Sequence, residues 1–122
     1  MAARTVEPAA STPPLPFMAA SADCPYRAMF EHITSKWGVL VLVQLSHGTL
    51  RWAELRRSIE GVTEKMLAQT LRTLEADGLV RREALPVVPP HVEYSLTADG
   101  HDVVARLTPV LEWLHTYVDR RD

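Results

Sequence analysis

The chain has 122 residues, of which 47% are hydrophobic, so it is long enough for one compact domain with a real core. A net charge of −2 and an isoelectric point near 6.2 argue against a strongly basic nucleic-acid binder, although a local basic face would still suffice. A single cysteine excludes an internal disulfide and a cysteine-rich zinc site.

Residues 1–22 are rich in Ala, Pro and Ser. Because such a segment buries little apolar surface, we expect a flexible N-terminal arm there and a folded domain over residues 23–122. No apolar run is long enough to cross a bilayer, and the N-terminus lacks the layout of a secretory signal. We therefore expect a cytoplasmic protein that does not associate with a membrane.

Cys24 and Pro25 open the expected domain. Pro is favoured at the first helical position, so a helix is predicted from here to about Ile33, with Cys24 at or beside its N-cap. The positive end of a helix dipole favours the reactive thiolate form of a cysteine. The same position also suits a half-buried cysteine that acts only as a small hydrophobic residue.

A second helix is predicted over residues 36–47. It is apolar nearly all round, which is typical of a central buried helix. A short β-prone connector follows at residues 49–52, and then a short helix at residues 53–59 with Arg56 and Arg57 on its outward side.

The segment from Val62 to Arg82 predicts one further helix, closed by a turn and followed by the start of a strand. The Thr63 hydroxyl can cap the first turn of this helix, and Gly78 can take the left-handed conformation that ends it. Two short helices joined by a turn that contains Gly61 describe a helix-turn-helix.

This candidate recognition helix has two different faces when it is drawn at about 100° per residue. The inward face is apolar and carries Leu67, Leu71 and Leu74. The outward face carries hydrogen-bond donors on Lys65, Gln69 and Arg72. Such a face suits a helix that enters a DNA major groove, whereas the segment alone is equally compatible with an ordinary amphipathic surface helix.

Two β-prone runs, at residues 79–85 and 92–97, are separated by a Pro-rich segment and predict a hairpin, or wing. Arg81, Arg82 and His91 lie where a wing could meet phosphate. For the two arginines, a solvated strand face is an equally good interpretation.

The last helix is predicted over about residues 98–119, with Thr97 as its cap. Its apolar stripe is too wide for a helix that lies on one small domain, and such a stripe usually packs on a second subunit as well. We therefore expect a homodimer. The stripe consists of Val103, Val104, Leu107, Val110, Leu111, Leu114, Tyr117 and Val118.

The sequence contains no metal-ligand spacing among its five histidines, no Gly-rich phosphate loop and no nucleophile elbow. We therefore expect neither an enzyme nor a bound metal or cofactor.

The elements and motifs together resemble the HxlR-type winged helix-turn-helix transcriptional regulators, which are related to the MarR group. The resemblance is carried by Cys24-Pro25, SKWGVLVLVQL (35–45), LRWAELRRSIEGVTEKMLAQTLRTLEADGLVRR (50–82), VPPHVEYSLTADG (88–100) and LTPVLEWL (107–114). It implies a mainly α fold with a small β-hairpin and with N- and C-terminal dimerisation helices. The expected function is that of a dimeric repressor or activator that binds double-stranded DNA at an inverted repeat.

Residue by residue, the resemblance implies DNA contacts from the recognition helix, from the entrance to the helix-turn-helix and from the wing. These are Thr63, Glu64, Lys65, Gln69 and Arg72, then Arg51, and then Pro89, Pro90 and His91. Cys24 matches the position that senses electrophiles or oxidants in some members. The chain departs from the family at Thr34-Ser35, where a Gly-Gly pair is usual, and at Trp52, which replaces Phe.

Two alternatives stay open. In one, the regulator responds to a non-covalent small-molecule ligand held between the dimerisation helices and the core. In the other, the winged helix binds a protein and no DNA, which would call for an acidic or apolar outward face. The arginine and lysine side chains expected on that face favour DNA.

Overall fold

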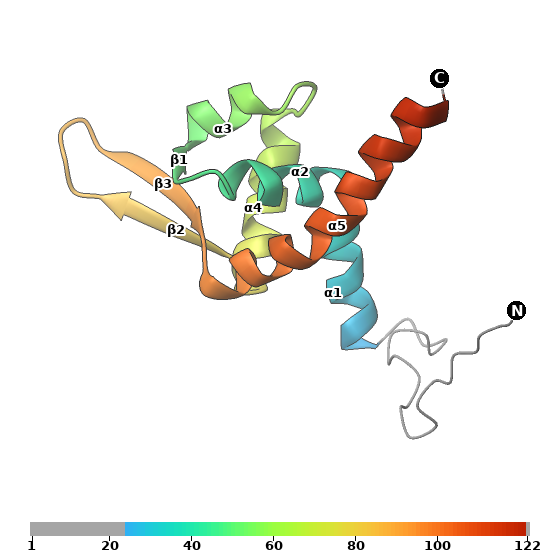
Figure 1. The fold of residues 1–122 in the computed structure, drawn as a ribbon. Coiled ribbons are helices and arrows are strands. Elements are labelled where there is room, and N and C mark those ends of the chain that lie inside the picture. Colours follow the sequence, from blue (N-terminus) through green and yellow to red (C-terminus); the bar gives the residue numbers. More distant parts are fainter. Residues whose placement is uncertain (1–23, 122) are drawn as a thin grey trace, which may run out of the picture. The chain divides into compact units, whose positions relative to one another are not determined.

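The computed structural model describes residues 24–121, so the expected arm at residues 1–22 lies outside the described part. The chain divides into two compact units, residues 1–31 and 32–122. Along the chain (Figure 1) the elements are α1 (Pro25–Thr34), α2 (Lys36–Leu45), β1 (Leu50–Arg51), α3 (Trp52–Ser58), α4 (Glu64–Ala76), β2 (Val80–Leu85), β3 (His91–Leu96) and α5 (Ala98–Arg121).

This order confirms the predicted mainly helical winged helix-turn-helix fold. Every predicted helix is present. α2 ends at Leu45 instead of the expected residue 47, because the chain turns at Ser46 and the Gly48 N–H bonds the Leu45 carbonyl. None of the helices within residues 24–121 is long and apolar enough to cross a membrane.

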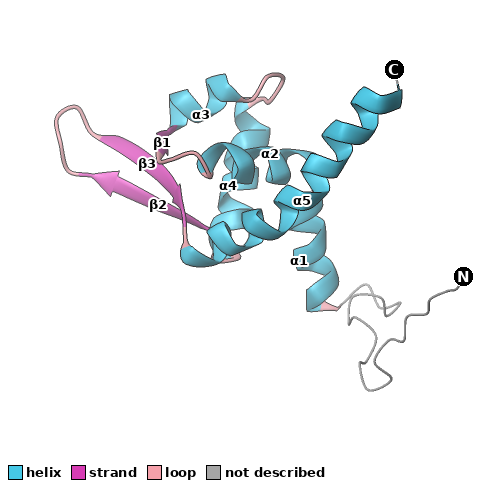
Figure 2. Ribbon diagram, in the orientation of Figure 1, coloured by secondary structure: helices cyan, strands magenta, loops and turns pink. Residues whose placement is uncertain are grey.

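The sheet has three strands where the sequence predicted only a hairpin (Figure 2). β3 lies in the middle, with β2 on one side and the two-residue strand β1 on the other, and both pairings are antiparallel. β1 pairs Leu50 with Tyr94. The short connector before α3 is therefore part of the wing sheet, which joins the wing directly to the helix-turn-helix.

The core lies where α2, α3 and α4 meet the base of the sheet, and the hairpin projects away from the helices (Figure 1). Its largest fully buried side chains come from the three helices: Val41, Leu42, Leu45, Leu55, Leu67 and Leu74. In β3, Tyr94 and Leu96 are buried against this core.

α4 is closed at both ends by the residues that the sequence indicated. The Thr63 hydroxyl accepts the Met66 N–H at 3.1 Å, and Gly78 takes a φ of +83° just beyond the helix. Thr97, which caps α5 by accepting the Gly100 N–H at 3.0 Å, also donates its hydroxyl hydrogen to the Gly78 carbonyl at 2.7 Å. One side chain therefore ties the end of α4 to the start of α5.

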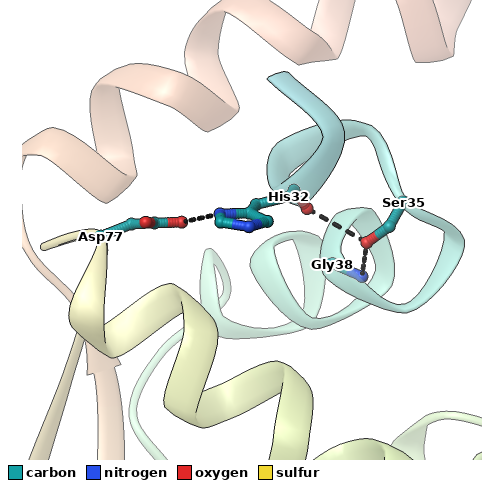
Figure 3. Close-up of polar contacts among 4 residues, drawn as sticks. All are labelled: His32, Ser35, Gly38 and Asp77. Atoms are coloured by element: carbon teal, nitrogen blue, oxygen red, sulfur yellow. Dashed lines mark hydrogen bonds and ion pairs between the residues drawn. The ribbon is translucent and has the colours of Figure 1, made fainter. Parts of the chain in front are cut away.

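The junction between α1 and α2 is tightly packed (Figure 3). The Ser35 hydroxyl donates to the His32 carbonyl and accepts the Gly38 N–H, each at 3.1 Å, so that Ser35 caps α2. A Cβ atom on Gly38 would overlap the His32 carbonyl oxygen, and only a glycine therefore allows this approach. The His32 ring points away from the junction toward Asp77, at the end of α4.

Candidate nucleic-acid interface

The outward face of α4 presents the three donors that the sequence placed there. Lys65, Gln69 and Arg72 are exposed, and the opposite face of the helix is packed into the core by the buried leucines at positions 67, 71 and 74. Neither Lys65 nor Arg72 forms an ion pair with any residue of the described chain. Two cationic groups and one amide are thus directed to solvent from successive turns of one helix.

The first turn of α4 has a different character. Thr63 is exposed but engaged as the cap, and Glu64 lies 3.4 Å from Arg56 of α3 as measured between Oε2 and Nη1. Since these side chains are 71% and 46% exposed, the ion pair adds little to stability. It does connect the two helices of the helix-turn-helix, and it lowers the negative potential that Glu64 would bring to the face.

α3 adds basic groups beside this face. Arg51 is exposed at the start of α3, where its backbone N–H donates to the Glu54 carboxylate at 2.8 Å. Arg57 is also exposed, and, like Arg51, it has no ion-pair partner within residues 24–121. The acidic and basic side chains of residues 51–77 balance in number, but Arg51, Arg57 and the two cations of α4 form no ion pair within the described residues and are exposed.

The tip of the wing is apolar and not basic. Pro89 and Pro90 are exposed in the loop between β2 and β3, beside Val88, which is 98% exposed. His91 is instead the first residue of β3, where it pairs with Leu85. The structure thus separates the two prolines at the tip from His91 on the sheet.

One face of the wing sheet carries acidic and basic groups side by side. In the strand register Glu83 lies directly opposite Glu93, and the half-buried His91 ring places its Nε2 3.5 Å from the Glu93 carboxylate. Arg81 lies on the same face and is 3.6 Å from Glu83. A phosphate that approached His91 would therefore meet Glu93 as well, whereas Arg82 lies on the opposite face of the hairpin.

Cys24 belongs to the first unit, at the start of α1. Its carbonyl accepts the N–H groups of Arg27 and Ala28 at 3.1 and 3.3 Å, which places it at the N-terminal boundary of the helix as predicted. The side chain is half-buried.

Sequence reasoning missed the contact between His32 and Asp77, whose ring nitrogen Nδ1 and carboxylate oxygen Oδ2 are 2.7 Å apart. The two residues are 45 positions apart, and no local periodicity could have paired them. Among residues 24–121 no group of three or more His, Cys, Asp or Glu side chains could hold a metal ion.

Comparison with known proteins supplies the family context. Residues 32–122 match the model of the HxlR-like helix-turn-helix family. The HTH-type transcriptional regulator YtfH of Escherichia coli K12 is 55% identical over 92 residues, which cover 75% of this chain and 73% of that protein.

Two solved structures have the same fold. The ytfH protein of Salmonella typhimurium, named a transcriptional regulator, superposes with a TM-score of 0.75 at 48% identity, over 82% of this chain and 89% of that one. The oxidised form of the redox regulator HypR superposes with a TM-score of 0.70 at 38% identity, over 76% of this chain and 96% of that one.

Proposed function

The chain belongs to the HxlR-like helix-turn-helix family of transcriptional regulators, and on this premise we propose that it binds double-stranded DNA sequence-specifically as a homodimer. α4 is the recognition helix, and an inverted repeat supplies one half-site to each protomer. The observation that carries the proposal is the outward face of α4, on which Lys65, Gln69 and Arg72 are exposed and directed away from the core.

The chemistry of this face fits the edges of base pairs in the major groove. An arginine can donate two parallel hydrogen bonds to guanine, and a glutamine can donate to and accept from adenine. Lysine supplies a point charge for phosphate or guanine. We assign base contacts to Gln69 and Arg72 and either kind of contact to Lys65.

The remaining proposed contacts position the helix on the duplex. Thr63 and Glu64 lie at the start of α4, and Arg51 lies at the start of α3. A hydroxyl and a guanidinium there suit phosphate oxygens, while the Arg56 ion pair holds Glu64 to one side. In the wing, Pro89 and Pro90 would meet the wall of the flanking minor groove, and His91 would reach its phosphates only with the side of its ring that does not face Glu93.

Dimerisation through α5 is supported by an exposed apolar stripe on its C-terminal half. The stripe consists of Val110 (57% exposed), Trp113 (56%), Leu114 (45%), Tyr117 (37%) and Val118 (49%). Contiguous exposed apolar side chains of this size mark an interaction surface in soluble proteins. Because an inverted repeat has two-fold symmetry, a second copy of this chain is the partner that the DNA geometry calls for.

We further propose that Cys24 senses electrophiles or oxidants. Two kinds of support exist: the position of Cys24 at the start of α1, and the similarity of the chain to HypR, which is named a redox regulator. With one cysteine per chain, oxidation by a diazene such as diamide joins two thiols into an intersubunit disulfide, and the two protons and two electrons that the thiols release reduce the diazene to a hydrazine. An electrophile would instead alkylate the thiolate.

A gel-shift titration at physiological salt tests the proposal. The probe is the intergenic DNA upstream of the protein's own gene, and a shuffled duplex of equal length serves as the control. We expect a specific shift whose midpoint changes after treatment with diamide. The absence of any preference for the upstream DNA would contradict the proposed DNA-binding function.

One observation favours non-covalent regulation as a second candidate. A depression of about 660 Å³ lies between the end of α2 and the middle of α5. Its lining mixes apolar residues with hydroxyl, imidazole and carboxylate groups, as ligand sites often do. The polar groups belong to Ser46, His47, Thr108, Glu112, His115 and Thr116. An inducer that works equally on the wild type and on Cys24→Ser would support this candidate over the thiol sensor.

A further inference from the structure

We propose that His32 and Asp77 are positioning residues for DNA recognition, because together they fix the C-terminal end of the recognition helix α4. The inference rests on the proposed function, since it assigns to α4 the role of reading DNA. It goes beyond that function, because it states that two residues outside the outward face of α4 set the orientation of that face.

His32 is itself held in place. Its carbonyl accepts the Ser35 hydroxyl at 3.1 Å, and Ser35 in turn accepts the Gly38 N–H at 3.1 Å (Figure 3). The close approach of Gly38 to the His32 carbonyl leaves no room for a Cβ atom. The backbone of His32 is therefore anchored to the first turn of α2, whose later residues form the centre of the core.

From this anchored backbone the His32 side chain contacts Asp77. An ionised carboxylate can only accept hydrogen bonds, so the His32 Nδ1–H donates to Asp77 Oδ2 at 2.7 Å. The Asp77 side chain is only 16% exposed and the His32 side chain 37%. A short hydrogen bond to a largely covered carboxylate is among the stronger polar contacts available to a protein.

The Asp77 carboxylate is poorly explained by the stability of α4 alone. It is the C-cap residue of the helix, where the dipole is negative and a carboxylate is unfavourable. The Asp77 N–H completes the helix by donating to the Thr73 carbonyl at 3.0 Å, a bond that any residue except proline could make. The carboxylate thus gains its favourable interaction from His32 and not from its own helix.

The chain just beyond α4 has a second support. The Thr97 hydroxyl donates to the Gly78 carbonyl at 2.7 Å. The C-terminal end of α4 is therefore tied by two side chains, His32 at Asp77 and Thr97 at Gly78. Base-edge contacts tolerate displacements of only a fraction of an ångström, so loss of one of these two supports misdirects Gln69 and Arg72 without unfolding the helix.

The experiment uses the full chain and a 20–30 base-pair duplex that the wild type selects from a random DNA library. The variants are His32→Ala, Asp77→Ala, the double variant, and Asp77→Asn, whose side-chain oxygen can still accept the Nδ1–H. His101→Ala, an exposed histidine on α5, is the matched control. Affinities for the selected duplex and for a scrambled duplex are measured side by side, together with helix content and the urea midpoint.

We expect each alanine variant to bind the selected duplex about tenfold more weakly while its affinity for the scrambled duplex is unchanged. The double variant should be no weaker than the weaker single variant, since both remove one interaction. Asp77→Asn should recover most of the loss. Asp77→Ala should lose DNA specificity without a matching loss of stability, because it also removes a carboxylate from the negative end of the helix dipole.

Three results would overturn the positioning role. The first is wild-type affinity for the selected duplex in both folded alanine variants. The second is an equal loss on the selected and the scrambled duplex. The third is that neither alanine variant reaches wild-type helix content, which would make the pair an element of fold stability. If the wild type selects no sequence at all, it is the proposed function that fails, whatever the variants do.

Discussion

Trp113 and Tyr117 stack on the exposed side of α5, with ring centroids 4.9 Å apart and ring planes 12° apart. Arg120 and Arg121 extend over the Tyr117 ring, at 5.5 and 5.8 Å from its centre. Within one protomer these rings cover each other only in part, because Trp113 remains 56% exposed. A pre-ordered aromatic surface of this kind loses little side-chain entropy when a second subunit covers it.

Leu114→Glu is expected to convert the dimer into a monomer. The substitution places a charge in the middle of the exposed α5 stripe, where a subunit interface would have to bury it. Sedimentation equilibrium should give the mass of one chain, and operator affinity should fall at least about tenfold once the second half-site no longer contributes. Ala105→Glu places the same charge on the opposite side of α5 and should remain dimeric. A dimeric Leu114→Glu would refute α5 as the interface.

Arg72→Ala is expected to bind the selected duplex about ten- to a hundredfold more weakly and to relax sequence preference at one base pair. Lys65→Ala, if that lysine meets phosphate, should weaken all sequences alike and lower the salt slope of binding by about 1. Both follow from their exposure on the outward face of α4. Fluorescence anisotropy between 50 and 300 mM salt separates the two effects.

The control for these two substitutions is Arg106→Ala. Arg106 is an exposed arginine on α5 whose Nε lies 3.2 Å from an Asp102 carboxylate oxygen. It should bind DNA as the wild type does. An Arg72→Ala protein that folds, dimerises and keeps its operator affinity would remove Arg72 from the reading face.

Cys24→Ser is expected to bind operator DNA like the reduced wild type and to be insensitive to diamide. The wild type should form a reducible dimer band in non-reducing electrophoresis, with a matching change in operator affinity that dithiothreitol reverses. Serine keeps the size of the side chain but cannot form a disulfide. A variant that still responds fully to diamide would exclude Cys24 as the sensor.

Thr97→Ala is expected to destabilise the fold by about 1–2 kcal/mol, because the hydroxyl makes two hydrogen bonds. It accepts the Gly100 N–H as the cap of α5 and donates to the Gly78 carbonyl beyond α4. Thr97→Ser keeps the hydroxyl and should stay within about 0.5 kcal/mol of the wild type. Urea unfolding monitored by helix content gives both values, and equal midpoints for the Ala and Ser variants would contradict this account.

The features that could be predicted from the sequence are those encoded by neighbouring residues. The cap at Thr63, the stop at Gly78 and the leucine face of α4 all follow from spacings of a few residues, and the structure confirms each of them. The sequence pattern also contained four residues of the exposed α5 surface, Val110, Leu114, Tyr117 and Val118, but it left out Trp113. A local pattern is enough when the physical cause is itself local.

The features that could not be predicted depend on pairing between distant segments. The strand β1 has only two residues and exists because β3 is beside it. The position of Glu83 opposite Glu93 depends on the strand register, which the loop between the strands sets. The pair of His32 and Asp77 likewise joins segments 45 positions apart.

The separation of the two faces of α4 has a consequence for how such regulators diverge. The buried leucines at positions 67, 71 and 74 hold the helix without help from positions 65, 69 and 72, whose side chains point to solvent. Exchange of an outward residue therefore costs little folding free energy. Under selection, a duplicated gene for this chain could acquire a new operator through one or two codon changes while its fold stays as it is.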